Sequence, residues 1–258
     1  MRKEAWTYSL TAGVMGAFGV LMRWLQCQNI FEPETGLAAR GHFLSVLMVL
    51  TLLGFAAALW RLSGRMSLEN AREEPEDALA PPPEKLAGAV LAFGALIAGA
   101  GAMLLFFTEG GRLFRLIALL GLLSAAVLAM LPQLPRWGAF GAWLAVTPVL
   151  FFALWLVGFY KERSVDPVLW AYAMQILTTA ACLLAAYRLC GCVFYRLKLR
   201  QTLFSCGLAT AFGLSALMDP HITAAARLLF AGWSVGCGAL CWVLLRNLRD
   251  DTEEEEEE

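Results

Sequence analysis

Charged residues are scarce in this sequence of 258 residues. Only 16% of them are Asp, Glu, Lys or Arg, against about a quarter in an ordinary soluble domain, and 59% are hydrophobic. A soluble fold cannot bury that much apolar surface, so the composition excludes a soluble globular protein. The basic residues lie between apolar runs rather than in one patch, and the sequence therefore predicts no nucleic-acid binding.

Motifs for catalysis, nucleotide binding and metal binding are missing as well. The chain has no Walker A pattern, no HExxH, no GxSxG and no CxxC pair, which leaves ATPase, zinc-protease and serine-hydrolase activities without sequence support. The only histidines, His42 and His221, are both predicted outside the bilayer, so the sequence argues against bis-histidine haem ligation within it. Most of the seven cysteines fall in apolar runs and indicate no disulfide framework. We predict no cofactor, and the sequence favours a protein that is not an enzyme.

What the sequence does contain is a series of long apolar runs. A helix needs about 20 apolar residues to cross the hydrocarbon core, and the runs are that long without the alternation of barrel strands. We predict an all-α fold, a polytopic transmembrane bundle of about eight helices in one domain over residues 1–249. The predicted spans are 5–22, 43–60, 86–107, 114–131, 138–160, 169–187, 202–218 and 222–245. The acidic, proline-rich segment 67–85 is predicted to be a mobile cytoplasmic loop, and 250–258 a solvated acidic tail.

The distribution of Lys and Arg predicts the orientation in the membrane. These residues are concentrated at the N-terminus, after every second predicted span and at the end of the last span. Translocating a positive charge is disfavoured, so this set belongs on the cytoplasmic side. The sequence therefore predicts a multi-pass protein of a bacterial cell membrane with both termini in the cytoplasm.

The sixth predicted span carries a polar stripe. Gln175, Thr178, Thr179 and Cys182 occur at helical spacing i, i+3, i+4 and i+7, on one face of the helix. Because a polar face toward lipid would be costly, the stripe is predicted to face other helices. There it could supply interhelical hydrogen bonds or line a substrate path.

Arg227 lies inside the last predicted span. An arginine below the interface costs a few kcal/mol unless it snorkels or pairs. Asp219 is too far back along a continuous helix for an i to i+4 contact, so we expect Arg227 to snorkel, with a binding role as the alternative. The predicted substrate-binding residues are therefore Gln175, Thr178, Thr179 and Arg227.

His42, His221 and Asp219 are candidate metal ligands at the predicted outer face. Carboxylates and imidazoles together can bind a divalent cation, although their spacing is not that of a ligand motif, and solvated loop polarity is the alternative. Asp219-Pro220-His221 also has the pattern of a helix start, with Asp219 as N-cap and Pro220 in the first turn. This second interpretation explains Asp219 without a function.

Small residues recur on several predicted helix faces. Glycine and alanine at such positions let helix backbones approach closely, which predicts a tightly packed bundle. Packing within the chain is the simpler interpretation, but a partner membrane protein or a second copy of the chain is also compatible with it. The residues concerned are Gly13, Gly16, Gly19, Ala95, Gly99, Ala102, Gly232 and Gly236.

The segment RWLQCQNIFEPETGL, residues 23–37, resembles the first outer loop of uncharacterised bacterial multi-pass membrane proteins. The resemblance covers a small fraction of the chain and implies no activity, ligand or catalytic residue.

The functional hypothesis that these features favour is a non-enzymatic accessory, sensory or transport-associated component of the membrane. The partner that the sequence predicts first is the lipid of the bilayer. One alternative is a transporter of a small solute or ion, with a path formed by the stripe of the sixth span, a kink at Pro148 and Arg227. A second alternative is an enzyme acting on a lipid or isoprenoid at the outer face.

Overall fold

The computed structural model describes residues 3–30, 43–67, 78–79, 85–108, 111–163 and 172–247. These residues form helices and no strand, which confirms the predicted all-α fold. The long helices are α1 (Lys3–Ile30), α2 (Phe43–Ser67), α4 (Lys85–Thr108), α5 (Arg112–Met130), α6 (Gly138–Arg163), α7 (Ala173–Val193), α8 (Leu199–Ser215) and α9 (Ala224–Arg246), with short 3-10 helices η1 (Leu131–Trp137) and η3 (Ala216–Met218).

Seven helical stretches of the described chain are long and apolar enough to cross a membrane. The longest, Arg112–Lys161, has 50 residues. As one helix it would be about 75 Å long, more than twice the hydrocarbon core. Instead, it contains both α5 and α6, which η1 joins into a hairpin that turns at Gly138 with a positive φ of 54°. Counted separately, the long α-helices of the described residues agree with the predicted number of about eight spans, and they make this an integral membrane protein by length and composition.

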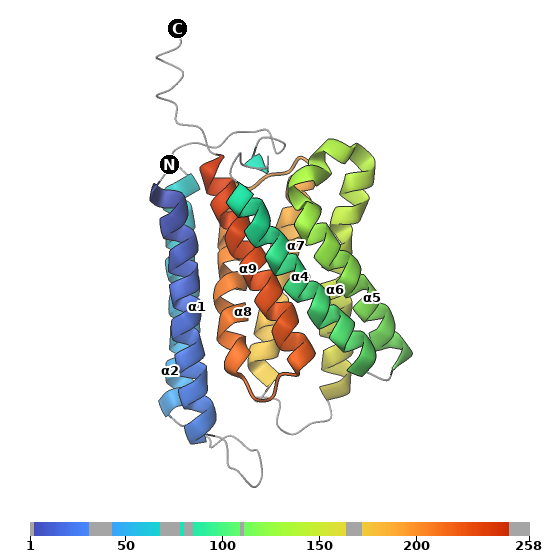
Figure 1. Cartoon of the computed structure of the whole chain (residues 1–258). Coiled ribbons are helices and arrows are strands. Elements are labelled where there is room, and N and C mark those ends of the chain that lie inside the picture. The colour runs from blue at the N-terminus through green and yellow to red at the C-terminus, as the bar shows by residue number, and fades with distance from the viewer. Residues whose placement is uncertain are drawn as a thin grey trace.

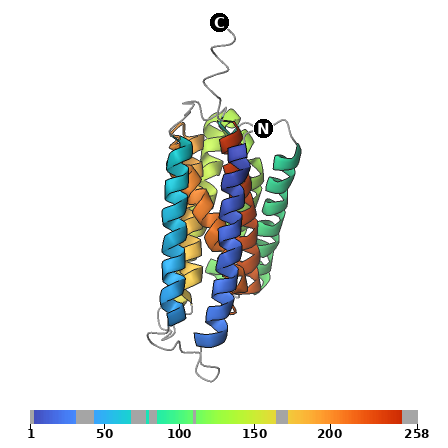
Figure 2. The same cartoon turned by 90° about the vertical axis from the view of Figure 1, so that its left-hand side faces the viewer.

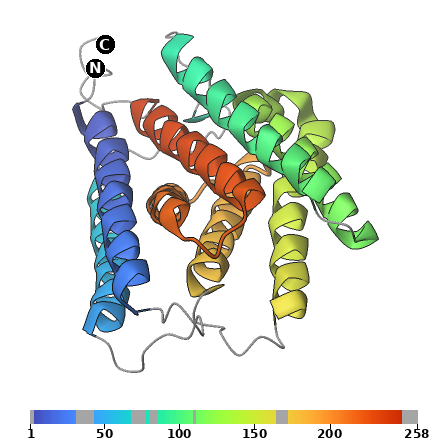
Figure 3. The same ribbon diagram turned by 60° about the horizontal axis from the view of Figure 1, so that its bottom comes forward.

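The helices form one bundle in which α8 and α9 are central (Figure 1). Most side chains of α9 are buried, whereas fewer than a quarter of those of α2 are. Figure 2 shows α1 and α2 side by side on one flank, and Figure 3 shows α4 and α5 on the other, with α9 between the two groups. On the α6 side, Trp155 stacks on Phe230 of α9 with ring centroids 5.3 Å apart.

Both α1 and α9 have their chain-terminal ends at the same end of the bundle (Figure 1). We call this end the terminal face and the other end the opposite face. A chain with an even number of spans must begin and end on the same side of the membrane, as these two helices do. Large apolar side chains such as Leu10, Phe43, Leu96 and Trp143 are exposed on the outside of the bundle, as lipid-facing residues are.

The first helix is longer than the predicted span. It continues past Met22 to Ile30, so Arg23 is helical rather than part of a loop. The helix breakers of this segment, Pro33 and Gly36, come later in the sequence. A positive charge at position 23 does not end the span, because its partner lies inside the bundle, as described below.

The predicted cytoplasmic loop and tail lie mostly outside the described residues. Within the loop, however, Ala78 and Leu79 are described, and both are buried. The side chain of Asn247 donates a hydrogen bond from Nδ2 to the Ala78 carbonyl oxygen at 3.0 Å. This part of the loop is therefore packed against the end of α9 rather than solvated, because it offers two apolar side chains to the bundle.

The prediction that Asp219 caps the last helix is wrong. Helix α9 begins at Ala224, and its N-cap is Thr223, whose Oγ1 accepts a hydrogen bond from the Ala226 backbone N–H at 3.3 Å. Asp219 follows η3 instead and is completely buried. Its carboxylate pairs with the guanidinium of Arg23 instead, in charge-assisted hydrogen bonds.

We expect Thr223→Ala to lower the free energy of unfolding by about 1 kcal/mol, the usual cost of losing an N-cap. Thr108→Ala is the matched control, because Thr108 is also exposed but bonds to the Leu104 carbonyl oxygen in the last turn of α4. Denaturation of both variants in mixed detergent micelles measures the difference. Equal losses in the two variants would show that the Thr223 cap contributes nothing.

Several of the predicted small residues, and Gly101 beside them, pack against helices of the same chain. A Cβ atom at Gly101 would lie 2.6 Å from the Leu229 backbone nitrogen, and one at Gly232 would collide with the backbone of Ala98. Helices α4 and α9 are therefore in backbone contact along their crossing. On the other flank, a Cβ atom at Gly16 would lie 2.7 Å from Leu214 of α8.

Candidate functional site

A buried ion pair lies at the opposite face of the bundle. It joins Arg23 of α1 to Asp219, which lies between η3 and α9. Arg23 is 2% exposed and Asp219 is 0% exposed. Arg23 donates to Oδ2 of Asp219 from Nε at 3.0 Å and from Nη2 at 2.6 Å. The pair ties the first helix to the turn that precedes the last.

Further hydrogen bonds satisfy both members of the pair. Arg23 Nη1 donates to Gln26 Oε1 at 2.6 Å, one turn further along α1. The other carboxylate oxygen of Asp219, Oδ1, accepts the backbone N–H of His221 at 3.0 Å. Burying charge costs several kcal/mol per ion unless each charge is paired and hydrogen-bonded, and this arrangement provides both.

Arg227 reaches the same cluster, although Asp219 lies too far back in the sequence for an i to i+4 contact along a helix. Its Nη2 donates to the backbone carbonyl oxygen of Asp219 at 2.8 Å. The contact is possible because α9 starts only at Ala224 and the segment before it turns back. Two donors of the cluster, Nε of Arg227 and Nε2 of Gln26, are buried without a hydrogen-bond partner.

Three of the predicted site residues therefore come together: Arg227 from the substrate-binding set, and Asp219 and His221 from the metal set. The His221 ring lies against Tyr172, with centroids 6.2 Å apart. His42 lies outside the described residues, and among the described ones no group of three or more His, Cys, Asp or Glu side chains could hold a metal ion. A cation at Asp219 would also have to displace the Arg23 guanidinium. The metal site stays a prediction.

The polar stripe of α7 faces the interior of the bundle. Gln175, Thr178 and Thr179 are all buried. Thr178 Oγ1 donates to the Phe212 carbonyl oxygen of α8 at 3.2 Å, and Thr179 Oγ1 donates to the Gln175 carbonyl oxygen at 2.7 Å. The Thr178 bond joins two helices, as expected for helix association in a membrane, whereas the Thr179 bond lies within α7. A role of the stripe in substrate binding stays a prediction.

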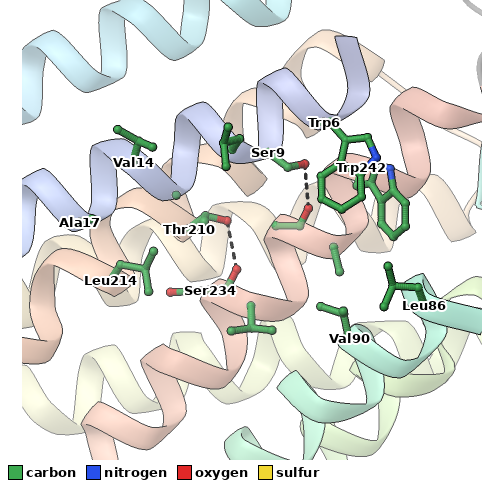
Figure 4. Close-up of a pocket in the computed structure, with 15 residues that line it drawn as sticks. Trp6, Ser9, Val14, Ala17, Leu86, Val90, Thr210, Leu214, Ser234 and Trp242 are labelled. Atoms are coloured by element: carbon green, nitrogen blue, oxygen red, sulfur yellow. Dashed lines mark hydrogen bonds between the residues drawn. The ribbon is translucent and has the colours of Figure 1, made fainter. Parts of the chain in front are cut away.

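A groove of about 440 Å³ runs between α1 and α4, with α8 and α9 as its floor (Figure 4). We call it the α1–α4 groove. It is lined by Trp6, Ser9, Leu10, Gly13, Val14, Ala17, Leu86, Val90, Thr210, Leu214, Ser234, Val235, Gly238, Ala239 and Trp242.

The groove lies beside the face of α1 that packs on α8, a contact that extends to Tyr8, whose hydroxyl donates to the Leu203 carbonyl oxygen at 2.8 Å. Toward the opposite face, Gly16 and Gly19 bring α1 against Leu214 and Ser215 of α8. Toward the terminal face, Gly13 has no heavy atom within 4 Å of a Cβ position, and the space there is open. The small residues that the sequence predicts to pack therefore have different roles. Gly16 and Gly19 bring two helices together, whereas Gly13 leaves open space beside α1.

The surface of the groove is almost entirely apolar. Its hydroxyl groups donate to backbone carbonyl oxygens: Ser9 to Gly238 at 3.1 Å, Thr210 to Cys206 and Ser234, and Ser234 to Phe230 and Ala209. Each hydroxyl proton is used inside the bundle, so a polar ligand would find little to bind. An apolar chain would fit better.

The groove has a defined depth in the membrane. At the terminal face the rings of Trp6 and Trp242 lie with centroids 4.9 Å apart (Figure 4). Tryptophan prefers the headgroup zone, so this pair marks the interface. From Trp6 to Ala17, α1 rises by about 16 Å, which is about half of the hydrocarbon core. The groove therefore spans one leaflet, and exposed Leu10 and Val14 lie on its lipid side.

Sequence reasoning missed Arg23 and Gln26. A signal was present, because Arg23 directly follows the first predicted span and Asp219 directly follows the seventh, at the same predicted face. Opposite charges at the same depth are candidates for a pair. Because Arg23 and Asp219 are 196 residues apart in the chain, no local sequence pattern indicates that they form a pair.

No model of a known protein family matches this chain, and no curated protein or solved structure shows detectable similarity to it. The resemblance of residues 23–37 to the first outer loop of bacterial membrane proteins stays a prediction.

Proposed function

We propose that this integral membrane protein is a non-enzymatic, transport-associated component that holds the apolar chain of a membrane lipid in the α1–α4 groove. The observation that carries the proposal is the groove itself, an apolar hollow open toward the bilayer and one leaflet deep. Its volume of about 440 Å³ falls within the range of about 300–1,000 Å³ that is usual for small-molecule sites.

Shape rather than hydrophobicity would select the occupant. A lipid chain in the bilayer is already in an apolar solvent, so it gains no hydrophobic free energy by entering the groove. The favourable contribution comes from van der Waals contacts with a preformed surface of small and branched side chains. This predicts exchangeable binding that depends on how well the groove is filled.

The ion pair would keep the groove in shape. Arg23 and Asp219 hold the far end of α1 against the α8–α9 turn, and the groove lies along the other half of the same helix. The bundle thereby combines a closed end with an open half, as expected of a component that takes up lipid from one leaflet.

We propose that this leaflet is the cytoplasmic one. Many basic residues belong to helix ends that Figure 1 shows at the terminal face. Among the described residues these are Arg61, Arg65, Arg136, Arg188, Arg196, Lys198, Arg200 and Arg246. At the opposite face, the charge of Arg23 is neutralised by Asp219 and does not count as a loop charge. The bias of basic residues that orients membrane proteins therefore favours the cytoplasm as the side of the terminal face.

Lipid binding is better supported than chemistry on a lipid. The groove contains no acid, histidine or cysteine among its lining residues, and its serine and threonine hydroxyls donate to backbone carbonyl oxygens. A nucleophilic hydroxyl requires a neighbouring base. The groove lining supplies none.

Photolabelling in vesicles tests the proposal. The probe is a phosphatidylcholine with a diazirine at the end of one acyl chain, and the labelled peptides are mapped by mass spectrometry. We expect label at the deep end of the groove floor, for example at Ser234, which is only 1% exposed. Filling the groove with Gly13→Leu should lower this labelling severalfold, because a Cβ at Gly13 points into open space and the protein should still fold.

Gly54→Leu is the matched control. Gly54 of α2 also has nothing within 4 Å of a Cβ position, but it does not line the groove. We expect it to leave floor labelling unchanged, and both variants should be labelled normally at exposed Leu53. A floor that is not labelled in the wild type, or that is labelled equally in Gly13→Leu, would refute lipid binding in the groove.

A further inference from the structure

A second cavity lies at the terminal face, on the side of the bundle away from the α1–α4 groove. Its volume is about 470 Å³, and it lies where α7 ends and α8 begins. Three cations line it, Arg188, Arg196 and Lys198, together with the aromatic side chains of Tyr187 and Phe194. We call it the basic pocket.

The backbone between the two helices holds the basic pocket in shape. The N–H groups of Phe194, Tyr195 and Arg196 bond to the carbonyl oxygens of Cys190, Cys192 and Gly191 at 3.1, 3.1 and 2.9 Å. Tyr195 has a φ of 58°, the left-handed conformation that ends many helices. The turn is thus fixed by hydrogen bonds, and it places Arg196 and Lys198 beside the last turn of α7.

The charges of the basic pocket are not balanced by the residues that the structure describes. None of the described carboxylates forms an ion pair with Arg188, Arg196 or Lys198, and the pocket lining contains no acid. The side chain of Arg188 lies 5.4 Å from the centre of the Tyr187 ring. Arg200, the next base in the sequence, is engaged elsewhere, over the ring of Trp60 at 4.1 Å.

Compensation of the helix dipole explains only a small part of this charge. The C-terminal end of a helix such as α7 is equivalent to roughly half a negative charge. Counted over the described residues, three cations therefore leave an excess of about two and a half positive charges around the cavity. An anion of one or two charges would offset much of it.

The surroundings indicate where that anion comes from. Tyr187 and Phe194 are 57% and 47% exposed at the end of a membrane-spanning helix, which is the position of the aromatic belt. The basic pocket therefore lies at headgroup depth. Basic pockets between helices at this depth bind anionic headgroups, and arginine can bind phosphate oxygens in pairs.

We propose that the basic pocket binds the headgroup phosphate of an anionic phospholipid. Arg188 and Arg196 would contact the phosphate oxygens and Lys198 would add a point charge, while Tyr187 and Phe194 would flank the glycerol and the first part of the acyl chains. This inference is independent of the α1–α4 groove, because the two sites share no lining residue.

The test compares lipids by thermal unfolding of the full chain in a neutral detergent. Phosphatidylglycerol, phosphatidylcholine and inorganic phosphate are added separately. We expect phosphatidylglycerol to raise the unfolding temperature more than phosphatidylcholine, and high salt to reduce the difference, because exposed charges are screened. Stabilisation by inorganic phosphate equal to that by phosphatidylglycerol would show a free-anion site and overturn the assignment to lipid.

The variant Arg188→Gln/Arg196→Gln/Lys198→Gln should lose the preference for phosphatidylglycerol. Its matched control is Arg112→Gln/Arg115→Gln/Arg136→Gln, which removes the same charge from exposed arginines outside the pocket and should keep the preference. An equal response to both lipids in the wild type, or a preference that survives in the pocket variant, would contradict the proposal.

Native mass spectrometry of Arg196→Gln alone provides a second measurement if the triple variant does not fold. We expect this variant to retain severalfold less phosphatidylglycerol than the wild type after detergent exchange. Equal retention would contradict the proposal on its own. Neither experiment involves the α1–α4 groove, so a negative result here leaves the photolabelling result for the groove standing.

Discussion

Replacing Arg23 by methionine is expected to destabilise the protein by about 3–5 kcal/mol, the usual cost of removing one partner of a buried ion pair. The cost arises because the carboxylate of Asp219, which is 0% exposed, would lose both guanidinium hydrogen bonds. Titration of the purified protein with SDS in mixed micelles measures the free energy of unfolding. A loss of this size would be a large part of the stability of an ordinary domain.

Two further variants separate the ion pair from a general effect of charge. Arg115→Met removes an exposed arginine at the same end of the bundle and should change stability by well under 1 kcal/mol. The double variant Arg23→Met/Asp219→Leu should recover a large part of the loss, because replacing a whole buried pair by apolar residues is often neutral. If Arg23→Met costs no more than Arg115→Met, the pair does not hold α1 in place.

Gly101→Ala is expected to destabilise the protein by about 1–3 kcal/mol, although alanine favours helix over glycine by about 1 kcal/mol. The added Cβ atom would lie 2.6 Å from the Leu229 backbone nitrogen and 2.8 Å from the Ala225 carbonyl oxygen. Both neighbours are backbone atoms of α9, so no side chain can rotate away and the two helices must separate.

Gly88→Ala is the control on the same helix. A Cβ atom at Gly88 would meet nothing within 4 Å, so only the helix propensity changes, and the variant should be neutral or slightly more stable. Thermal unfolding in detergent gives both values. A Gly101→Ala variant as stable as Gly88→Ala would mean that the α4–α9 crossing tolerates a methyl group, which would contradict close backbone packing there.

The two helix contacts made by small residues, like the Arg23–Asp219 ion pair, also affect the shape of the α1–α4 groove. The α4–α9 contact and the contact of Gly16 and Gly19 with α8 hold the bundle together on both sides of α9. Between them the open position at Gly13 creates the groove. A loss of either contact should therefore change lipid labelling of the groove floor as well as stability.

The charged residues of the chain fall into two groups with different physical roles. Arg23 and Asp219 are buried and paired, so their contribution is to packing and orientation of helices. Arg188, Arg196 and Lys198 line an open cavity at the interface without a described acidic partner, so their contribution is to binding. In the sequence both groups follow predicted spans, so position along the chain does not by itself distinguish a buried pair from a binding site.

The all-α fold, the membrane class and the number of helices followed from composition and hydropathy. Each span is a local property, because a backbone in lipid must satisfy its own hydrogen bonds within about 20 consecutive residues. The interior direction of the α7 stripe also followed from helical spacing, since a polar face cannot be left in lipid.

The partner of Arg23, the true start of α9 and the α1–α4 groove depended on how the helices pack. Arg23 and Asp219 are 196 residues apart, and their contact arises only because α1 lies against the end of α8. The groove likewise results from a difference between Gly13 and Gly16, which have the same side chain but different neighbours. Local pattern determines which residues enter the membrane, whereas long-range packing determines which of them meet and where space is left.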